Sequence, residues 1–405
     1  MDDSVRLRAA TAADLPAIAD LMGQVFHEHV SDDFREWEVR ITEAERSLVS
    51  DDGGLVVGHA TAQTRDLSVP GAVIPAAHVT GVGVAPTHRR RGLLSGMMRR
   101  QLTEIAEAGR EAVAVLWASE TAIYPRFGYG PAADRLRLEI ATRELRVTAP
   151  VQRVRLRMVK PLEARAELAA LHDRLRADRP GWSSRADHWW RYLLRDESDQ
   201  RDGATGLYGV IVDGGEGPAG YALWRVKNGW NSYGPDASVR IEEVVAADPV
   251  TYTELWRFLL TIDLARKASY SYATVDEPLQ YLVDEPRRLG RQYADALWVR
   301  LVDVPAALEA RRYLFPVDVV IEVTDPIIEA NNGRWRLTAD KDKASCVRTD
   351  DAPDLRCTVT ELGAAYLGGT SLATLAAAGR VERLTANFPS AAFGWHRQPG
   401  ALEVF

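Results

Sequence analysis

Three consecutive arginines followed by a glycine are the residues whose types and spacing point most clearly to chemistry. They occupy residues 89–92 of "VTGVGVAPTHRRRGLLSGMM", between an apolar run and a helix that begins at about Gly92. The first backbone N–H groups of a helix have no partner inside it, and the helix dipole is positive there. Gly92 lets an anion approach the backbone, and guanidinium groups add charge-assisted hydrogen bonds. A bare arginine run is more often a solvated helix start, but the order strand, proline, arginines, glycine and helix favours a site for an anion such as pyrophosphate.

A tyrosine and the end of the chain are the other candidates for chemistry. Tyr124 follows a predicted strand by a few residues, and a tyrosine hydroxyl can donate a proton. The alternative is a core tyrosine with a satisfied hydroxyl, which is the role we assign to Tyr129. The chain ends on "GALEVF", apolar to its last residue, whereas an ordinary terminus is polar and frayed.

The elements that must position these residues indicate a layered α/β or α+β arrangement. "VRLRAATAADLPAIADLMGQVF" predicts a short strand and a helix, with Thr11 and Asp14 in a capping-box arrangement. Two strands separated by a Pro/Gly turn follow, and then an amphipathic helix closed by Gly109. "AVAVLWAS" completes this block as a continuous buried strand.

Two further blocks follow the first. "SVRIEEVVAADPVTYTELWRFLLTID" repeats the order strand, break and helix without an arginine–glycine cluster, which indicates a degenerate repeat that has lost the phosphate-binding turn. The third block begins near residue 288 with a strand, an Asp-Val-Pro turn and a helix. Two strands around an Asn-Asn-Gly turn then predict a hairpin, and a strand feeding short helices ends the block.

Composition limits the classes of function. The 405 residues exceed one hydrophobic core, so two or three domains are expected, and 46% apolar with 26% charged residues is typical of a globular protein. A net charge of −7 argues against nucleic-acid binding and suits a small cationic substrate. Cys346 and Cys357 match no zinc spacing and suggest reduced thiols. The N-terminus lacks an apolar signal segment and no stretch could span a bilayer, so we expect a cytoplasmic protein without a membrane partner.

The arginine–glycine stretch resembles the acetyl-CoA motif of the GCN5-related N-acetyltransferases (GNAT), whose consensus is Gln/Arg-x-x-Gly-x-Gly/Ala. Here "VAPTHRRRGLL" carries Leu94 in place of the small last residue, which is similar to the enhanced intracellular survival (Eis) acetyltransferases of actinobacteria. "ASETAIYPRFGYGPA" matches the second motif of that family, and "VDVPAALEARRY" and "LGAAYLGG" resemble its sterol-carrier-protein-like domain. With the aromatic last residue, the resemblance covers essentially the whole chain.

The resemblance implies an α+β fold with tandem GNAT-like domains and a sterol-carrier-protein-like α/β domain. The expected limits are 1–135 for the catalytic domain with the acetyl-CoA site, 136–287 for the degenerate second domain and 288–405 for the third. The C-terminus is expected to enter the active site. The resemblance also implies a homohexamer.

Acetyl-CoA is implied as co-substrate, without a metal. The pantetheine arm is expected between two splayed strands, where backbone amides pair with it as an added strand would, so side-chain identity matters little. The positions that match the cofactor contacts of the family are Val82, Gly83, Val84, Arg90, Arg91, Gly92, Leu93, Leu94, Ser95, Ser119 and Glu120.

The family resemblance gives Tyr124 and Phe405 catalytic roles. An ammonium must lose a proton before it attacks a thioester, and the departing thiolate is helped by gaining one. Tyr124 is expected to be the general acid, and the terminal carboxylate of Phe405 the base. A free α-carboxylate has a pKa of about 3.5, which burial would raise, making it a better base. An ordinary docked tail is the alternative. His27, His29 and His78 are tempting as alternative bases, but His78 is expected to be a strand histidine with no role.

The acceptor is expected to be a small cationic amine, because the family acetylates aminoglycosides at several amines. Carboxylates and aromatic faces suit a cation, and the loop after the first helix offers Phe26, Glu28 and Trp37 as substrate contacts. A solvated acidic loop is the alternative for each of them. Two other functions stay open: a lipid or sterol carrier, suggested by the third block, and a non-catalytic acyl-CoA-binding protein.

Overall fold

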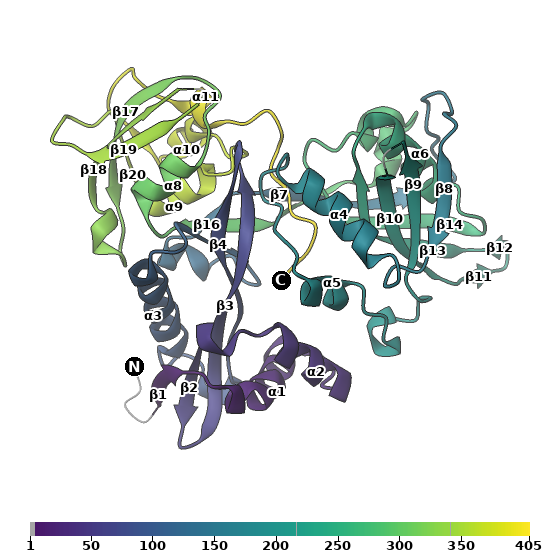
Figure 1. The fold of residues 1–405 in the computed structure, drawn as a ribbon, viewed down its shortest axis with the longest axis horizontal. Helices are drawn as coiled ribbons and strands as arrows, with labels where there is room; N and C mark the ends of the chain where they lie inside the picture. The colour runs from purple at the N-terminus through teal and green to yellow at the C-terminus, as the bar shows by residue number, and fades with distance from the viewer. Residues whose placement is uncertain (1–4, 216, 341) are drawn as a thin grey trace. The chain divides into compact units, whose positions relative to one another are not determined.

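The computed structural model describes residues 5–215, 217–340 and 342–405, and the chain divides into two compact units. The first unit joins the described residues up to Ala133 to Ala296–Pro399 and Val404–Phe405. The second unit comprises Asp134–Asp295 and Gly400–Glu403. Figure 1 labels the helices and strands of both.

The N-terminal part of the first unit is built on a sheet with the strand order β1-β2-β3-β4-β5-β16-β6. Strands β3 and β4 form a long antiparallel hairpin, and β4 and β5 run parallel with α3 between them in the chain. Helix α1 packs on β3 and β4, and α3 packs on β2, β3 and β4; α1 and α3 lie on either side of the hairpin in Figure 1. The elements are β1 Arg6–Ala9, α1 Leu15–Phe26, α2 Asp32–Ile41, β2 Ser47–Asp52, β3 Leu55–Val69, β4 Ala72–Val84, α3 Leu93–Ala108, β5 Val113–Trp117, β6 Gly130–Pro131 and β16 Leu297–Leu301.

Local signals explain most of these boundaries. The carboxylate of Asp14 accepts hydrogen bonds from the backbone and hydroxyl of Thr11 at 2.8 Å each, so the expected capping interaction is confirmed, on a single 3-10 turn that leads into α1. Helix α3 begins after Gly92 and ends at Gly109, and both glycines have left-handed φ angles, 81° and 62°. Most of the segment expected as a loop after α1 is instead helix α2, because Ser31 caps it by accepting from the Phe34 N–H.

The third domain contains a second sheet in the order β19-β18-β17-β20-β21. Strands β17 and β18 pair antiparallel, so the predicted hairpin is confirmed, but a longer connection with a 3-10 turn at Glu329–Asn331 replaces a tight Asn-Asn-Gly turn. The elements are α8 Val304–Ala310, β17 Val317–Thr324, β18 Gly333–Ala339, β19 Ala344–Arg348, β20 Leu355–Thr358, α9 Val359–Ala365, α10 Leu372–Ala377, β21 Glu382–Arg383 and α11 Ser390–Phe393.

Strand β16 ties the third domain to the first sheet. This strand was expected in the third block, but β16 pairs antiparallel with β5, from Leu297↔Trp117 to Leu301↔Val113, and with β6. Helix α9 packs against both β16 and β6. One buried hydrophobic cluster therefore runs from the N-terminal sheet into the third domain. The sequence pattern of an apolar strand is the same in either sheet, and only its pairing partners decide to which sheet it belongs.

The second unit has its own sheet in the order β15-β7-β14-β13-β10-β9-β8. Strand β13, an Asp-Pro break and helix α6 follow each other as expected, and strand β14 comes next. Asp248 caps α6 by accepting from the Thr251 N–H. Like β4 and β5, strands β13 and β14 run parallel. The elements are β7 Asp134–Ala141, β8 Arg155–Val159, α4 Arg165–Arg176, α5 Asp187–Leu193, β9 Tyr208–Gly214, β10 Gly217–Lys227, β11 Trp230–Asn231, β12 Gly234–Pro235, β13 Ala237–Ala246, α6 Pro249–Leu260, β14 Ala265–Ala273, α7 Leu279–Leu282 and β15 Gln292–Asp295.

Candidate active site

The parallel strands β4 and β5 separate toward their C-terminal ends. Their pairing runs from Ala76↔Val113 to His78↔Val115, while β4 continues to Val84. On its other edge, β4 stays paired with β3 as far as Val84. The edge of residues 79–84 that faces away from β3 therefore has backbone groups available to a ligand, as the sequence analysis expects for a pantetheine arm.

A bulge in β4 lies where this separation begins. The register passes from Thr61↔Thr80 to His59↔Gly83, which leaves one extra residue in β4. Gly81 has a φ angle of 57°, and its carbonyl lies 2.8 Å from Nδ1 of the buried His59. Burial lowers the pKa of His59 to about 4, so the neutral ring donates to that carbonyl through Nδ1–H at neutral pH. A side chain on Gly81 would press against this ring, so a glycine suits the bulge.

A cavity of about 1020 Å³ opens beside the separated strands and the start of α3. It is lined by every predicted cofactor contact except Arg91, and also by Tyr124. The structure thus brings these residues around one cavity; that they bind a cofactor remains a prediction. The further lining residues, which the sequence analysis did not assign to the cofactor, are Val25, Phe26, His27, His88, Arg89, Ile123 and Arg126.

The arginine–glycine turn forms the polar wall of this cavity. Arg90 has a left-handed φ of 65°, and the first backbone bond of α3 runs from the Gly96 N–H to the Gly92 carbonyl. The N–H groups at the start of α3, at Leu93, Leu94 and Ser95, therefore lack acceptors within the helix. Arg89 lines the cavity as Arg90 does, whereas a guanidinium N–H of Arg91 lies 3.4 Å from the Thr87 carbonyl. The wall combines cations, unpaired N–H donors and a glycine, which is the chemistry of a phosphate site.

Tyr124 is the first residue of a 3-10 turn, Tyr124–Phe127. Its side chain is 5% exposed and lines the cavity. Burial raises the pKa of Tyr124; the Ser119 hydroxyl opposes that rise and the Glu120 carboxylate adds to it. The phenol is therefore protonated at neutral pH and able to donate. Tyr129 is fully buried and does not line the cavity, although its ring lies 6.1 Å from that of Tyr124. It is a core tyrosine as expected, but the expectation of a satisfied hydroxyl is wrong, because the hydroxyl has no hydrogen-bond partner among the described residues.

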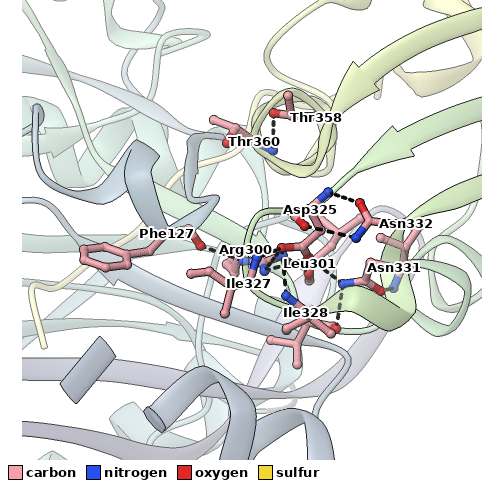
Figure 2. Close-up of polar contacts among 12 residues, drawn as sticks. Phe127, Arg300, Leu301, Asp325, Ile327, Ile328, Asn331, Asn332, Thr358 and Thr360 are labelled. Carbon is pink, nitrogen blue, oxygen red and sulfur yellow. Dashed lines mark hydrogen bonds and ion pairs between the residues drawn. The ribbon is translucent and has the colours of Figure 1, made fainter. Parts of the chain in front are cut away.

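Figure 2 shows a buried ion pair whose arginine contacts Phe127, the last residue of the 3-10 turn that begins at Tyr124. Arg300 of β16 donates from Nε to the Phe127 carbonyl at 2.7 Å, and from Nη2 to both oxygens of Asp325 at 2.8 and 2.7 Å. Both charged side chains are fully buried. Asp325 also accepts from the backbone N–H groups of Ile327 and Ile328. The pair was not predictable from local sequence, because its partners lie on β16 and in the loop after β17.

The last residue docks on β4. One terminal oxygen of Phe405 accepts a hydrogen bond from the Thr80 hydroxyl at 2.8 Å. Its ring meets His78 edge-on at 4.7 Å, and the Arg65 guanidinium lies 5.7 Å from the ring centre. Phe405 is half-buried and does not line the cavity. His78, considered in the sequence analysis as a base, therefore packs against the terminal residue.

The three predicted substrate contacts are not brought together. Phe26 lines the cavity, and 44% of the residue is exposed. Trp37 lies on α2, where the Arg40 guanidinium is 5.1 Å from its ring centre. Neither Trp37 nor Glu28 lines the cavity. Their role as acceptor contacts remains a prediction.

No group of three or more histidine, cysteine, aspartate or glutamate side chains among the described residues is arranged to hold a metal ion. Across residues 5–215, 217–340 and 342–405, no helix combines the length and the apolar character needed to cross a bilayer.

Family models match three parts of the chain. Acetyltransferase (GNAT) domains match residues 6–132 and 181–301, and a sterol carrier protein domain matches residues 304–399. The predicted order of two GNAT-like domains and a sterol-carrier-protein-like domain is thereby confirmed. The second match includes the break between β13 and α6, which carries no arginine–glycine cluster.

Named relatives are similar over most of their length. An uncharacterized N-acetyltransferase of Streptomyces avermitilis is 45% identical, covering 89% of this chain and 91% of the relative. The N-acetyltransferase Eis of Mycobacterium tuberculosis is 36% identical, covering 82% and 80%. The crystal structure of Eis1 from Mycobacterium abscessus superposes with a TM-score of 0.86 at 32% identity, covering 99% of this chain and all of that one. A GCN5-related N-acetyltransferase from Anabaena variabilis, 21% identical, has the same fold with a TM-score of 0.86.

Proposed function

Because this chain belongs to the Eis family of GNAT N-acetyltransferases, we propose that it transfers the acetyl group of acetyl-CoA to a primary amine of a small cationic substrate. Its activity as an N-acetyltransferase follows from the family, and acetyl-CoA is the co-substrate of GNAT enzymes. The nature of the acceptor and the roles of individual residues are the proposal.

The observation that carries the proposal is the cavity that joins the start of α3 to Tyr124. Its polar wall offers N–H donors and two guanidinium groups to a pyrophosphate. The available edge of β4 offers backbone groups to the amides of a pantetheine arm, as in strand addition. These features line one cavity, which supports the binding of coenzyme A there.

The proposed reaction is direct attack of the amine on the thioester. The acceptor loses a proton from its ammonium to the terminal carboxylate of Phe405, and the amine forms a bond to the thioester carbonyl carbon. The carbon–sulfur bond breaks, the Tyr124 hydroxyl gives its proton to the departing sulfur, and the nitrogen releases its remaining extra proton to solvent. The products are an N-acetyl amide and free coenzyme A, and the proton held by the carboxylate returns to the tyrosine through solvent. Support comes from the protonated, cavity-lining Tyr124 and from the docking of Phe405 on the same strand that borders the cavity.

A thiol-release assay with a panel of amines tests the proposal. Aminoglycosides, polyamines and lysine peptides are mixed with the enzyme and acetyl-CoA, and the products are weighed by mass spectrometry. We propose aminoglycosides as acceptors, so the expected result is amine-dependent thiol release with a gain of one or more acetyl groups. Thiol release without an acetylated product, or none with any amine, would contradict acyl transfer to amines.

A homohexamer in the cytoplasm is a further part of this proposal. It rests on the family resemblance, and acetyl-CoA is available in that compartment. Light scattering is expected to give about six times the 44.8 kDa of one chain. A mass of one chain would contradict the assembly without affecting the acetyl-transfer proposal.

A further inference from the structure

The two GNAT domains share a geometry at their parallel strand pairs. In the first domain the last paired residues are His78 and Val115, and in the second they are Ile241 and Tyr270. Each first strand then continues beyond its partner, to Val84 in β4 and to Ala246 in β13. In an active domain this separation makes room for ligands; the second domain lacks the turn that would bind a phosphate.

The first strands of the two parallel pairs, β4 and β13, each hold part of the C-terminal tail at the same position. Two residues after the last pair stand Thr80 in β4 and Glu243 in β13. Thr80 donates directly to the terminal oxygen of Phe405. Glu243 holds the tail through Arg185, which also binds Glu403. Residues 400–403 belong to the second unit and residues 404–405 to the first.

Arg185, Glu243 and Glu403 form what we call the tail clamp. Arg185 donates from Nε to Glu403 at 2.8 Å, and from Nη1 and Nη2 to the two oxygens of Glu243 at 3.0 and 2.7 Å. Nη2 also contacts Glu403, and the Tyr221 hydroxyl donates to Glu243. The Arg185 side chain is fully buried, 4.7 Å from the ring centre of Trp190. These hydrogen bonds connect Arg185 to the tail and to β13.

The charged groups of the clamp contribute mainly by fixing the position of the tail, and less by stabilising the fold. Burial would lower the pKa of Arg185, but the two carboxylates raise it well above the usual value, so the cation persists. Buried ion pairs lose much of their Coulomb energy to desolvation, and apolar side chains of similar size are often as stabilising. A guanidinium group between two carboxylates is instead specific in geometry, because its N–H groups donate only in fixed directions.

Neighbouring contacts fix the rest of the tail segment. The Gly400 N–H donates to the Pro180 carbonyl at 3.0 Å, and a side chain on Gly181 would collide with the Gly400 carbonyl. Leu402 is 8% exposed. It packs in a cluster with Ala164, Leu168, Leu171, Trp190, Leu194, Ile211, Tyr221, Leu223 and Val245.

We propose that the second GNAT domain is the receptor for the C-terminal tail of its own chain, and that Arg185 is a positioning residue for the terminal carboxylate. Two residues separate Glu403 from the end of the chain, and two residues span at most about 7 Å. Holding Glu403 therefore confines the carboxylate of Phe405 to a small volume. This inference rests on the proposed function for the catalytic consequence, but not for the anchoring itself.

The test uses Arg185→Met in the full-length protein, with Arg191→Met as the matched control, because Arg191 makes an exposed pair with Asp187 in the same domain. Carboxypeptidase A, which removes aromatic C-terminal residues, is added to the native protein, and loss of Phe405 is followed by intact mass. Arg185→Met is expected to lose Phe405 at least tenfold faster than the wild type and the control. Its kcat is expected to fall at least tenfold, with the KM for acetyl-CoA unchanged.

Milder variants keep the test decisive if Arg185→Met fails to fold. Glu403→Gln keeps an acceptor for Arg185 and should give a smaller effect, and Arg185→Lys keeps the charge without the fork. Faster loss of Phe405 without a fall in kcat would overturn the positioning role. An unchanged rate of Phe405 loss in folded variants would overturn the anchoring. Deletion of Phe405 separates the two proposals, because full turnover of that truncated protein contradicts the carboxylate as base and leaves the protease result standing.

Discussion

The hydroxyl of Tyr124 is the group on which the proposed proton transfer depends. We predict that Tyr124→Phe lowers kcat by about 10²–10⁴-fold, because a positioned acid contributes about that much. The affinity for coenzyme A, measured by calorimetry, should stay the same, because the polar wall of the cavity is unchanged. Tyr129→Phe is the matched control: its buried hydroxyl has no hydrogen-bond partner among the described residues, so its removal should leave turnover intact. Normal turnover in Tyr124→Phe would contradict the acid role.

His59 gives a pH-dependent prediction at the same scale. Its pKa is lowered to about 4 in the folded state and is about 6.5 when unfolded. The unfolded state therefore binds more protons below pH 6.5, and stability falls as the pH drops toward 4. Between pH 7 and pH 5 this group lowers the free energy of unfolding by about 2 kcal/mol.

Urea unfolding at both pH values checks this contribution. His59→Asn should lose about 2 kcal/mol less between pH 7 and pH 5 than the wild type, because asparagine does not titrate. Other titrating groups are common to both proteins and cancel in the comparison. An identical loss in the two proteins would show that the ring is not buried as a neutral donor to Gly81.

Single residues also show where sequence reasoning stopped. The motif predicted the cavity wall, but it favoured Arg91 over Arg89. Three adjacent arginines differ in direction only through backbone angles, and the left-handed conformation at Arg90 turns the chain between them. Such a conformation is uncommon for a residue other than glycine, so the sequence carried no signal for it.

At the scale of elements, the Arg300–Asp325 pair links β16, the loop after β17 and the turn of Tyr124. We predict that Arg300→Met lowers the free energy of unfolding by about 3–5 kcal/mol, because it leaves a buried carboxylate without its counter-ion. Arg336→Met is the matched control, since its pair with Asp318 is exposed and should contribute little. Chemical denaturation measures both, and equal losses would mean that burial of the pair is not what matters.

Element types were largely predictable, and element partners were not. The glycines around α3 and the Asp-Pro start of α6 are local signals, and both helices formed as expected. Helix α2 was missed although Ser31 is a good cap, because its acidic, weakly apolar sequence resembles a solvated loop. Strand β16 was recognised as a strand, but its place beside β5 depends on pairing across almost two hundred residues.

At the scale of the whole molecule, the order of the three domains followed from motifs, while their interdependence did not. The first unit is discontinuous in sequence, because residues 296–399 return to complete what the N-terminal residues begin. Local periodicity cannot reveal such closure, since the apolar pattern of a strand does not name its neighbour. The tail that ends in Phe405 is the same kind of feature, and only the family resemblance anticipated its docking.

This discontinuity predicts different fates for isolated fragments. A fragment of residues 1–135 lacks β16, so the edge of β5 and the buried Val113 and Val115 would be exposed. A fragment of residues 134–295 keeps every strand of its own sheet and its own hydrophobic cluster. We therefore expect the second fragment to unfold cooperatively in thermal circular dichroism, and the first to show no cooperative transition and to bind a hydrophobic dye. Cooperative unfolding of residues 1–135 would contradict the structural role of β16, because that strand would then be dispensable for the core that it completes.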